Sequence, residues 1–309
     1  MKFVLVGDLH LRASKPVNRI DDFVAAQEAK IRKVFEIGAA VEAPILMTGD
    51  IFDSHDAALS VLVKYLPIFK GYPHGIYSPP GNHDVYGASL DTLGRSALGV
   101  AVAAEAITLL GHEPTLIGDE IALYGHSYMH RDGRPSPMSG RRNFLVTHEM
   151  VLMDKLWREQ EDFQMADEYI RTAGDWELIL CGHYHYKFVV ERGSRKIVNP
   201  GALVRIKASK GDMALQPGVF VYDTETKRLD RVDLTAEPSE VVFREKAKQE
   251  QVTSSLADFV SKLTVQQIST GSRFESVLSS VITESWCEDS VRDLLLNYLA
   301  DVEVGGAGD

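Results

Sequence analysis

The sequence has few of the features that mark membrane, secreted or disulfide-rich proteins. It contains only two cysteines, Cys181 and Cys287, so no disulfide framework is implied and a reducing compartment is expected. No apolar run approaches the roughly 20 residues that a bilayer requires. The apolar opening at residues 3–6 is interrupted at once by Asp8, which argues against a secretory signal. We therefore expect a cytoplasmic protein without a membrane partner.

Positive charge is also scarce. The 44 Asp and Glu residues outnumber the 33 Lys and Arg residues, and the formal net charge is −11. Free-standing electrostatic binders of nucleic acid are usually basic. However, residues 237–309 hold 13 acidic and six basic side chains, so most of the excess lies there. Since a local field decides docking, the charge weakens a nucleic-acid hypothesis without excluding it.

The pattern of apolar residues predicts an α/β fold. Short β-branched runs at 2–6 and 45–48 alternate with helical patterns at 21–41 and 57–69. From residue 107 onward, short strands follow one another with little helix between them, which indicates two sheets packed face to face with helices outside. The later strands are expected at 107–110, 121–124, 144–147, 178–181, 188–191, 196–198 and 219–222.

The pattern changes after Pro238, where apolar residues recur at helical spacing in three short segments. We expect one domain at 1–237 and a small helical region at 238–309. The helices would either cap a substrate channel, offer an apolar groove to a partner, or pack as a lid on their own core.

Five clusters place Asp, Asn or His directly after an apolar, strand-like run. Strand ends converge on one edge of a sheet, so polar tips far apart in sequence can meet there. Glycine beside most of them lets the backbone turn sharply. The clusters are Gly7-Asp8-Leu9-His10, Gly49-Asp50-Ile51-Phe52-Asp53, Gly81-Asn82-His83-Asp84, Thr147-His148-Glu149 and Gly182-His183-Tyr184-His185.

The donor types in these clusters are carboxylate, amide oxygen and imidazole, without thiolate. They suit Mn²⁺, with Fe²⁺ or Zn²⁺ as alternatives. A carboxylate shared by two ions would hold them about 3.5–4 Å apart, close enough to grip one phosphate and to lower the pKa of a water. The other histidines, expected to be ordinary surface or core residues, are His55, His74, His112, His126 and His130.

The series Asp-x-His, Gly-Asp-x-x-Asp, Gly-Asn-His-Asp, His and Gly-His-x-His resembles the calcineurin-like metallophosphoesterase superfamily over about residues 1–235. The resemblance implies a four-layer αββα sandwich with a site for two divalent metal ions. It implies that Asp8, His10 and His185 bind the first ion, that Asn82, His148 and His183 bind the second, and that Asp50 bridges them.

The resemblance further implies that His83 is the general acid toward the leaving oxygen and that Asp84 orients it. Chemistry supports an acid here, because a phosphodiester leaving group is a poor alkoxide and an imidazolium can protonate it. The alternative is that His83 is itself a metal ligand.

Within the superfamily, the chain is most similar to the SbcD-type nuclease subunits of the double-strand-break repair complex, and by its compact size to bacteriophage members. The similar segments are 6–11, 49–53 and 198–205, whereas Asp53 and Val85 depart from the usual His and Pro. This branch implies a Mn²⁺-dependent DNA exonuclease or endonuclease of recombination and repair, acting as a homodimer with a coiled-coil, SMC-like ATPase. The chain has no phosphate-binding loop of its own, so any ATP dependence must come from that partner.

Basic residues near the motifs are candidates for binding the DNA backbone, which positions a strand without reading its sequence. They are equally compatible with ordinary solvated loops. Two other functions stay open: a phosphatase or phosphodiesterase of small molecules using the same site, and a scaffolding subunit with a structural metal site. The candidate DNA-binding residues are Arg131, Arg134, Arg141, Arg142, Arg205 and Lys207.

Overall fold

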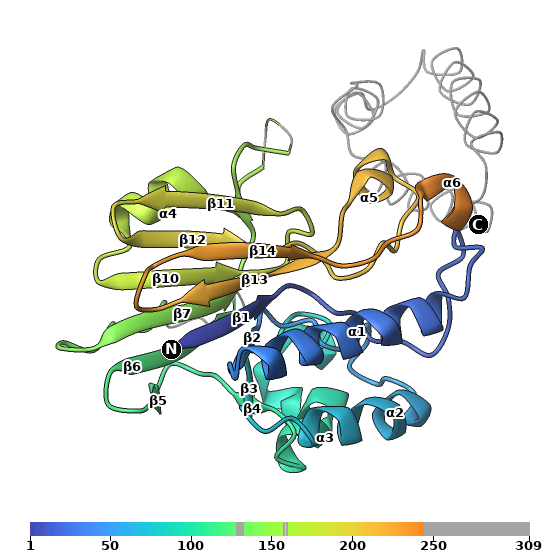
Figure 1. The fold of residues 1–309 in the computed structure, drawn as a ribbon, viewed down its shortest axis with the longest axis horizontal. Helices are drawn as coiled ribbons and strands as arrows, with labels where there is room; N and C mark the ends of the chain where they lie inside the picture. Colours follow the sequence, from blue (N-terminus) through green and yellow to red (C-terminus); the bar gives the residue numbers. More distant parts are fainter. Residues whose placement is uncertain (128–132, 157, 159, 244–309) are drawn as a thin grey trace, which may run out of the picture.

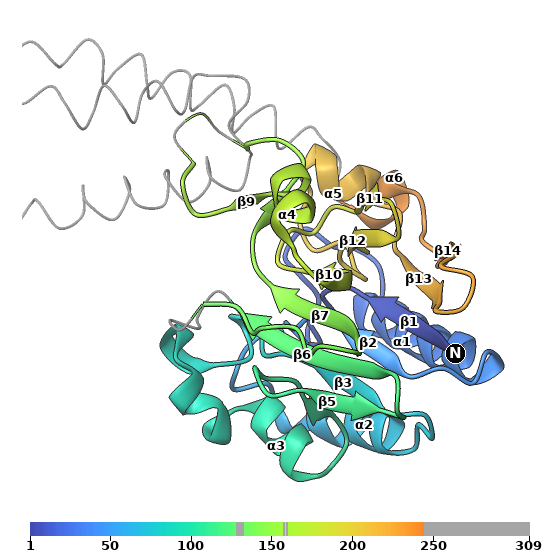
Figure 2. The same ribbon diagram turned by 90° about the vertical axis from the view of Figure 1, so that its left-hand side faces the viewer.

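The computed structural model describes residues 1–127, 133–156, 158 and 160–243. Within them, two six-stranded mixed sheets lie face to face, with helices outside each sheet (Figures 1 and 2). The expected α/β sandwich of four layers is therefore confirmed. No helix in the described ranges is both long and apolar enough to cross a membrane.

The first sheet has the order β14-β13-β1-β2-β3-β4. Strands β1 to β4 run parallel, and β13 and β14 extend the sheet in antiparallel fashion. The strands are β1 (Lys2–Val6), β2 (Ile45–Met47), β3 (Ile76–Ser78), β4 (Thr108–Leu109), β13 (Gly218–Asp223) and β14 (Leu229–Asp233), and the helices outside are α1 (Phe23–Ala40), α2 (Leu59–Lys70) and α3 (Ala97–Ala103).

The second sheet has the order β11-β12-β10-β7-β6-β5, with a parallel centre and an antiparallel strand at each edge. Helix α4 (Ala166–Thr172) packs outside it. The strands are β5 (Thr115–Ile117), β6 (Ile121–Ser127), β7 (Arg142–His148), β10 (Trp176–Cys181), β11 (Phe188–Arg192) and β12 (Arg195–Asn199).

Short elements complete the description. They are the 3₁₀ helices Tyr86–Ala88 and Leu90–Arg95, the strand pair β8 (Val151–Leu152) and β9 (Gln164–Met165), and the helices α5 (Lys210–Ala214) and α6 (Ser239–Val242).

Three apolar clusters fill the three interfaces between the four layers. Strand β1 shows why, because its side chains alternate between faces: Val4 and Val6 meet the outer helices, whereas Phe3 and Leu5 meet the second sheet. All four are fully buried. A strand buried on both faces reads as a continuous apolar run, which is how the sequence reads at residues 3–6.

The expected boundary at 237/238 stays a prediction. Helix α6 lies against the loop that follows β1, where the Ile20 N–H donates to the Val242 carbonyl. The three C-terminal helices expected after residue 250, with their possible role as a cap or partner-binding region, lie outside the described residues.

Candidate dinuclear metal centre

Five parallel strands end at the same edge of the sandwich and carry the expected ligands there. In the first sheet, β1 is followed by Asp8 and His10, β2 by Asp50, and β3 by Asn82. In the second sheet, β7 ends in His148, and β10 is followed by His183 and His185. The structure thus brings together all seven residues expected to bind metal.

The first group consists of Asp8, His10 and His185. One donor atom of each lies within 4.8 Å of the others. The Nε2 atoms of His10 and His185 are 3.1 Å apart, and Nε2 of His185 is 3.6 Å from Oδ2 of Asp8. This is the set that the sequence resemblance assigns to the first ion.

The second group consists of Asp50, His148 and His183, with Asn82 beside them. Oδ1 of Asn82 lies 3.0 Å from Nε2 of His148 and 2.9 Å from Nδ1 of His183. These two histidine nitrogens are 3.2 Å apart. The expected ligands of the second ion therefore also converge.

Asp50 lies between the two groups. Its Oδ2 is 3.3 Å from Nε2 of His148 in the second group and 3.8 Å from Nε2 of His10 in the first. Its Oδ1 accepts a hydrogen bond of 2.9 Å from the backbone N–H of His83. One oxygen facing both groups is the arrangement expected of a bridging carboxylate.

Several atoms of the cluster are hydrogen-bond acceptors that face other acceptors, an arrangement that a bound divalent cation would satisfy. A neutral imidazole has one donating and one accepting nitrogen, and in His148 the Nδ1–H faces the Thr48 carbonyl at 2.8 Å. Its Nε2 then offers a lone pair toward Asn82 Oδ1 and Asp50 Oδ2, which are also acceptors. A cation would satisfy all three, and the oxygen and imidazole donors suit Mn²⁺, Fe²⁺ or Zn²⁺.

Charge within the cluster is tightly coupled. Burial alone would raise the pKa of Asp50, but the imidazoles of His148 and His10 outweigh it and hold the pKa well below its usual range. Burial would lower the pKa of His148, yet Asp50 and Asp8 raise it to about 9. Burial and the neighbouring His148 lower the pKa of His183 to about 3. Without metal, these shifts favour the protonated imidazole at His148 and the neutral imidazole at His183, and His148 must lose that proton before its Nε2 can bind a cation.

We accordingly expect metal binding to release a proton and to tighten as pH rises. Below about pH 9 a cation must displace the proton of His148, so the apparent affinity for Mn²⁺ should rise up to about tenfold per pH unit. Calorimetric titration of chelator-treated protein in two buffers of different ionisation enthalpy measures both the affinity and the protons released. An affinity that stays constant between about pH 6 and 8 would contradict the protonated state of His148.

The ligand loops contain backbone that is unusual for residues with side chains. His10, Asp50 and His183 have φ values of 47°, 46° and 70°, in the left-handed region that non-glycine residues seldom adopt. Hydrogen bonds hold them there: the His10 N–H donates to the Asp50 carbonyl, and the His183 N–H donates to Asp8 Oδ2 at 2.9 Å. Such strain is typical of functional sites.

The glycines beside the ligands serve mainly for close approach. Gly49 has φ +97° and does turn the chain, as the sequence suggested. A Cβ at Gly81 would lie 2.1 Å from Asp50 Oδ1, and one at Gly182 would lie 2.4 Å from Asp8 Oδ1. A side chain at either position would displace a candidate metal ligand.

His83 lies at the opening of the cluster. Its side chain is 43% exposed, and its Nε2 is 4.0 Å from Asp50 Oδ2. Its Nδ1 makes a hydrogen bond of 2.8 Å with the backbone carbonyl of Asp53, which only a protonated Nδ1 can donate. An exposed Nε2 suits a proton donor, but His10, Asp50 and His83 also form a possible three-ligand group, so the alternative of His83 as a ligand stays open.

The expectation that Asp84 orients His83 stays a prediction, and the partners that the structure shows for Asp84 are backbone N–H groups. Its buried carboxylate accepts backbone N–H bonds from Ile51 (3.3 Å), Phe52 (3.1 Å) and Gly81 (2.9 Å). It therefore ties the loop after β2 to the loop after β3, and the hydrogen-bond partner of the His83 ring is the Asp53 carbonyl.

Two supporting residues were missed from the sequence. The Thr48 hydroxyl donates to Asp8 Oδ1 at 2.6 Å. Gln27 of α1 is fully buried and donates through Nε2 to the His10 carbonyl at 2.9 Å. A signal for Gln27 existed, because it falls at helical spacing between the apolar residues Phe23 and Ile31; a polar residue on such a stripe needs a partner.

Two of the candidate DNA-binding arginines are committed to internal ion pairs. Arg134 makes two hydrogen bonds to Glu149, of 3.0 and 2.8 Å, and stacks over Tyr169 with 4.1 Å from Cζ to the ring centroid. Arg142 makes a two-pronged pair with Glu177. These contacts neutralise both guanidinium groups.

The parallel pair β6 and β7 separates the arginines in space. Ser127 and His148 are paired at one end of it, and Arg142 lies at the other. A seven-residue strand spans roughly 20 Å, so Arg142 and its neighbour Arg141 are far from the ligand cluster. Arg131 lies outside the described residues.

The last two candidates differ from each other. Arg205 is buried, where it donates to the carbonyls of Leu215 and Glu237. Lys207 is exposed. It precedes α5, whose Gly211 lies against the Tyr186 hydroxyl next to His185. Of the described candidates, Lys207 is the one whose residue is exposed.

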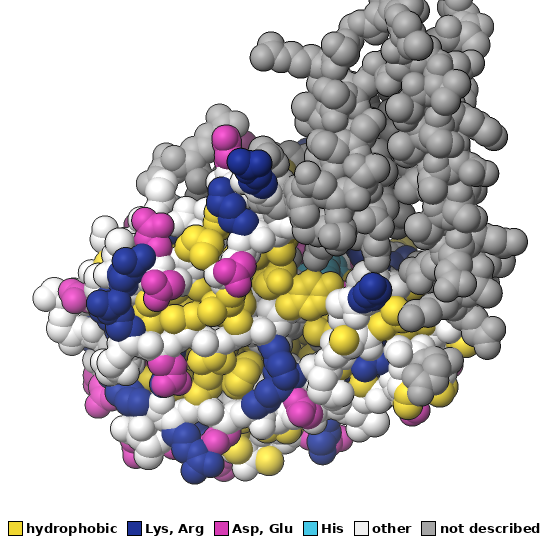
Figure 3. All heavy atoms as spheres, turned by 90° about the horizontal axis from the view of Figure 1, so that it is seen from above, with side chains coloured by type: hydrophobic (Ala, Val, Ile, Leu, Met, Phe, Trp, Pro, Cys, Tyr) yellow, Lys and Arg dark blue, Asp and Glu magenta, His cyan; other side chains and the backbone are white. Residues whose placement is uncertain are grey.

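The surface beside the cluster is hollowed. In Figure 3, histidine atoms reach the surface between apolar and basic side chains. A cavity of about 550 Å³ adjoins His183, and several of its other lining residues are acidic. The lining residues besides His183 are Glu149, Met150, Glu161, Asp162, Phe163 and Gln164.

The chain was compared with known proteins. A search of curated proteins found no match. Among solved structures, the chain is similar to a novel archaeal phosphodiesterase (16% identity, 76% of this chain and 100% of the other, TM-score 0.42). It is also similar to a putative 5'-nucleotidase from Staphylococcus aureus (11% identity, 84% of this chain and 58% of the other, TM-score 0.48). A third similar structure is Zn²⁺-complexed Vps29 from Entamoeba histolytica (14% identity, 75% of this chain and 99% of the other, TM-score 0.35).

A family model gives the assignment. The model described as calcineurin-like phosphoesterase matches residues 1–210, which is more than half of the chain and includes every expected metal ligand. With its two mixed sheets and its converging ligand groups, the chain belongs to the calcineurin-like phosphoesterase family.

Proposed function

We propose that the protein hydrolyses phosphodiester bonds in DNA with two divalent metal ions, as the nuclease subunit of a recombination and repair complex. The observation that carries the hydrolytic chemistry is the convergence of two ligand groups on the shared carboxylate of Asp50. DNA as substrate is supported by the resemblance of the sequence motifs to those of SbcD-type nucleases and by the exposed Lys207, which follows the last motif.

The chain's own residues divide the work of the reaction. One ion would be held by Asp8, His10 and His185. The other would be held by Asn82, His148 and His183, and Asp50 would bind both ions. When bound, the ions supply charge neutralisation of the phosphate and a lowered pKa for the attacking water. His83 then donates a proton from Nε2 to the leaving oxygen, while its Nδ1–H stays on the Asp53 carbonyl.

Purified full-length protein with Mn²⁺ tests the proposal directly. End-labelled linear duplex and single-stranded DNA should be degraded, and a chelator should stop the reaction. Products resolved on a sequencing gel would show whether cutting begins at ends or internally. Hydrolysis of small phosphodiesters with no cleavage of either DNA would contradict the proposed substrate.

Charge-reversal variants test whether these basic residues bind the DNA backbone or lie in ordinary solvated loops. Changing Lys207 or Arg131 to Glu should weaken DNA cleavage and lower the dependence on salt by about one unit of slope for each phosphate that is no longer bound. Arg141→Glu is the matched control, because it reverses the same charge at the far end of β7. Cleavage is measured at several salt concentrations, and equal effects of Lys207→Glu and Arg141→Glu would remove the path from consideration.

A second function, hydrolysis of a small phosphodiester or phosphomonoester, is favoured by one observation. The cavity beside His183 is acidic, and Arg134 near it is neutralised by Glu149. An acidic lining repels the next phosphate of a DNA strand bound at the metal centre, whereas it accepts a neutral or cationic group of a small substrate. Higher kcat/KM for a small diester with a cationic leaving group than for DNA would favour this function.

We also propose that the partner is a coiled-coil ATPase and that the nuclease works as a homodimer, on the basis of the sequence similarity. Since the chain lacks a phosphate-binding loop, ATP should change nuclease activity only when such an ATPase is present. Light scattering of the purified chain measures the oligomeric state.

A further inference from the structure

A second pocket, separate from the metal centre, lies between α1 and the segments that flank β13 and β14. Its volume is about 360 Å³, within the range of small-molecule sites. None of the residues that line it belongs to the metal-ligand set. Its lining includes four basic side chains, Arg19, Lys30, Lys33 and Arg205.

Two of these cations are built into the protein. Arg19 is 4% exposed and donates to both carboxylate oxygens of Asp21 and to the Arg205 carbonyl at 2.6 Å. Arg205 is 8% exposed and is held by two backbone carbonyls. Neither guanidinium can swing away to solvent, so the positive wall of the pocket is fixed in place.

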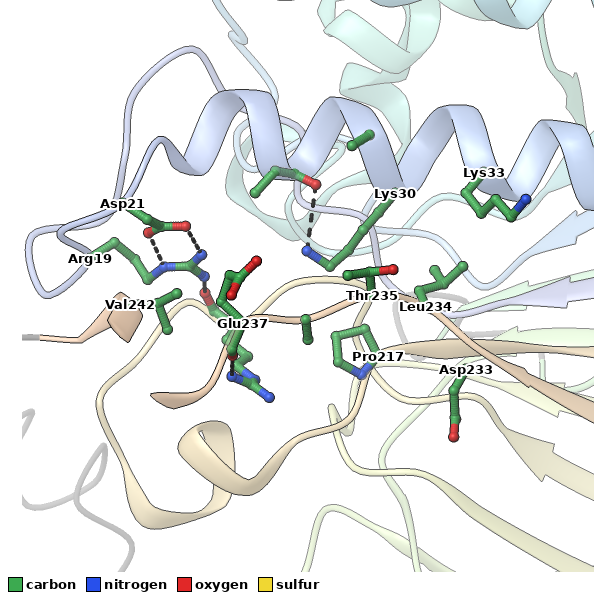
Figure 4. Close-up of a pocket in the computed structure, with 14 residues that line it drawn as sticks. Arg19, Asp21, Lys30, Lys33, Pro217, Asp233, Leu234, Thr235, Glu237 and Val242 are labelled. Atoms are coloured by element: carbon green, nitrogen blue, oxygen red, sulfur yellow. Dashed lines mark hydrogen bonds and ion pairs between the residues drawn. The ribbon is translucent and has the colours of Figure 1, made fainter. Parts of the chain in front are cut away.

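Lys30 has no comparable partner among the described residues. Its Nζ makes one long hydrogen bond, of 3.4 Å, to the Ala26 carbonyl of its own helix. Figure 4 shows the side chain reaching from α1 into the space above Glu237 and Thr235, with the Arg19–Asp21 pair to one side. Burial, and then the charges of Arg19 and Arg205, lower the pKa of Lys30 to about 8.

Most of the charges around the pocket have partners among the described residues, whereas the Lys30 amine has no ion pair. Asp21 is paired with Arg19, Lys33 with Glu36, and Asp233 with Arg231. Arg205 lies near the buried carboxylate of Asp212, which leaves Lys30 with the exposed Glu237 and the already paired Asp21 as its nearby acids. A half-buried amine beside two guanidinium groups raises the free energy of the empty site, and a bound anion lowers it.

We propose that this pocket binds a phosphate monoester of a small molecule, with the phosphate against Lys30 and Arg205. Lysine binds phosphate as a point charge. Arg205, whose Nε and Nη1 already donate to backbone carbonyls, adds fixed positive charge to the wall. The rest of the pocket wall is apolar and can cover an organic group. It consists of Ala26, Ala29, Pro217, Leu234, Ala236 and Val242.

Calorimetric titration of metal-depleted full-length protein tests this site without interference from the metal centre. Inorganic phosphate should bind saturably at one site, and glycerol phosphate should bind more tightly because its carbon chain meets the apolar wall. Asp50→Ala, which removes the shared metal ligand, should leave phosphate binding unchanged. Equal affinity for the two ligands would overturn the assignment to an ester.

Lys30→Met should weaken binding at least tenfold. Lys70→Met is the matched control, because Lys70 is an exposed helical lysine outside the pocket whose Nζ also contacts a backbone carbonyl. The proposal is overturned if no saturable binding occurs, or if the two variants bind phosphate equally.

Limited acetylation, quantified peptide by peptide, gives a second readout on the unmodified sequence. A bound anion favours the charged amine of Lys30 and therefore slows its acetylation, whereas Lys70 should react at the same rate with and without glycerol phosphate. Absence of protection at Lys30 under saturating glycerol phosphate contradicts the site.

Discussion

Asp50→Ala is expected to abolish phosphodiester hydrolysis and to reduce bound metal. The Oδ2 atom of Asp50 faces His10 in one ligand group and His148 in the other, so its loss weakens both groups together. Loss of several kcal/mol of charge stabilisation, taken as about 4 kcal/mol, corresponds to roughly a thousandfold in rate. We expect at least this fall in kcat/KM, with less than one ion retained per chain.

Activity on a chromogenic phosphodiester with Mn²⁺ and metal content by elemental analysis measure the two effects. Asp56→Asn is the control, because Asp56 is an exposed carboxylate of the same loop whose side-chain partner is Ser54. Asp50→Asn preserves the shape and the acceptor for the His83 N–H but removes the charge, which distinguishes lost metal from misfolding. Full activity with Asp50→Asn would eliminate a bridging carboxylate.

His83→Ala is expected to lower turnover by about 10²–10⁴, the range typical of a general acid, while metal content persists. The loss should depend on the leaving group. An alkoxide needs the proton that the exposed Nε2 of His83 supplies, whereas p-nitrophenolate leaves readily without it. We therefore expect a much smaller effect on bis(p-nitrophenyl) phosphate than on DNA or an alkyl diester.

His55→Ala is the matched control, because His55 lies on the loop between β2 and α2 and contacts Tyr86 rather than a candidate ligand. Turnover of both substrate types and metal content are compared for the two variants. Loss of metal on His83→Ala would show that His83 is a ligand, which its place in the group with His10 and Asp50 allows. An equal loss on good and poor leaving groups would contradict proton donation.

The sequence by itself determined the fold class and the identity of the residues that converge. Each ligand lies at the end of a strand or in the loop that follows it, and strand-forming runs such as residues 2–6 are local signals that the structure reproduces as β1. Parallel strands place their carboxyl ends at one edge, so residues after β1, β2 and β10 had to meet if the sheets formed. The structure also contains strands that the sequence analysis did not predict, because they are short or lie at a sheet edge and carry a weak apolar pattern. They are β3, β5, β8, β9 and β14.

Only the tertiary structure decided which partners these residues have. Asp84 is adjacent to His83 in sequence, yet its carboxylate turns toward the backbone of residues 51, 52 and 81 because three buried N–H groups require an acceptor there. Neighbouring positions in sequence do not fix side-chain direction, so the Asp53 carbonyl became the partner of His83 instead.

The same limit applies to charge. Arg134 and Arg142 look alike in the sequence as free basic residues, but the fold supplies Glu149 and Glu177 as partners, and buried or half-buried cations are stable only when they are paired. Conversely, no pattern along the chain indicated that Arg19, Lys30 and Arg205 share a pocket. Sequence patterns report on neighbours along the chain, whereas charge compensation depends on segments that only the folded chain brings together.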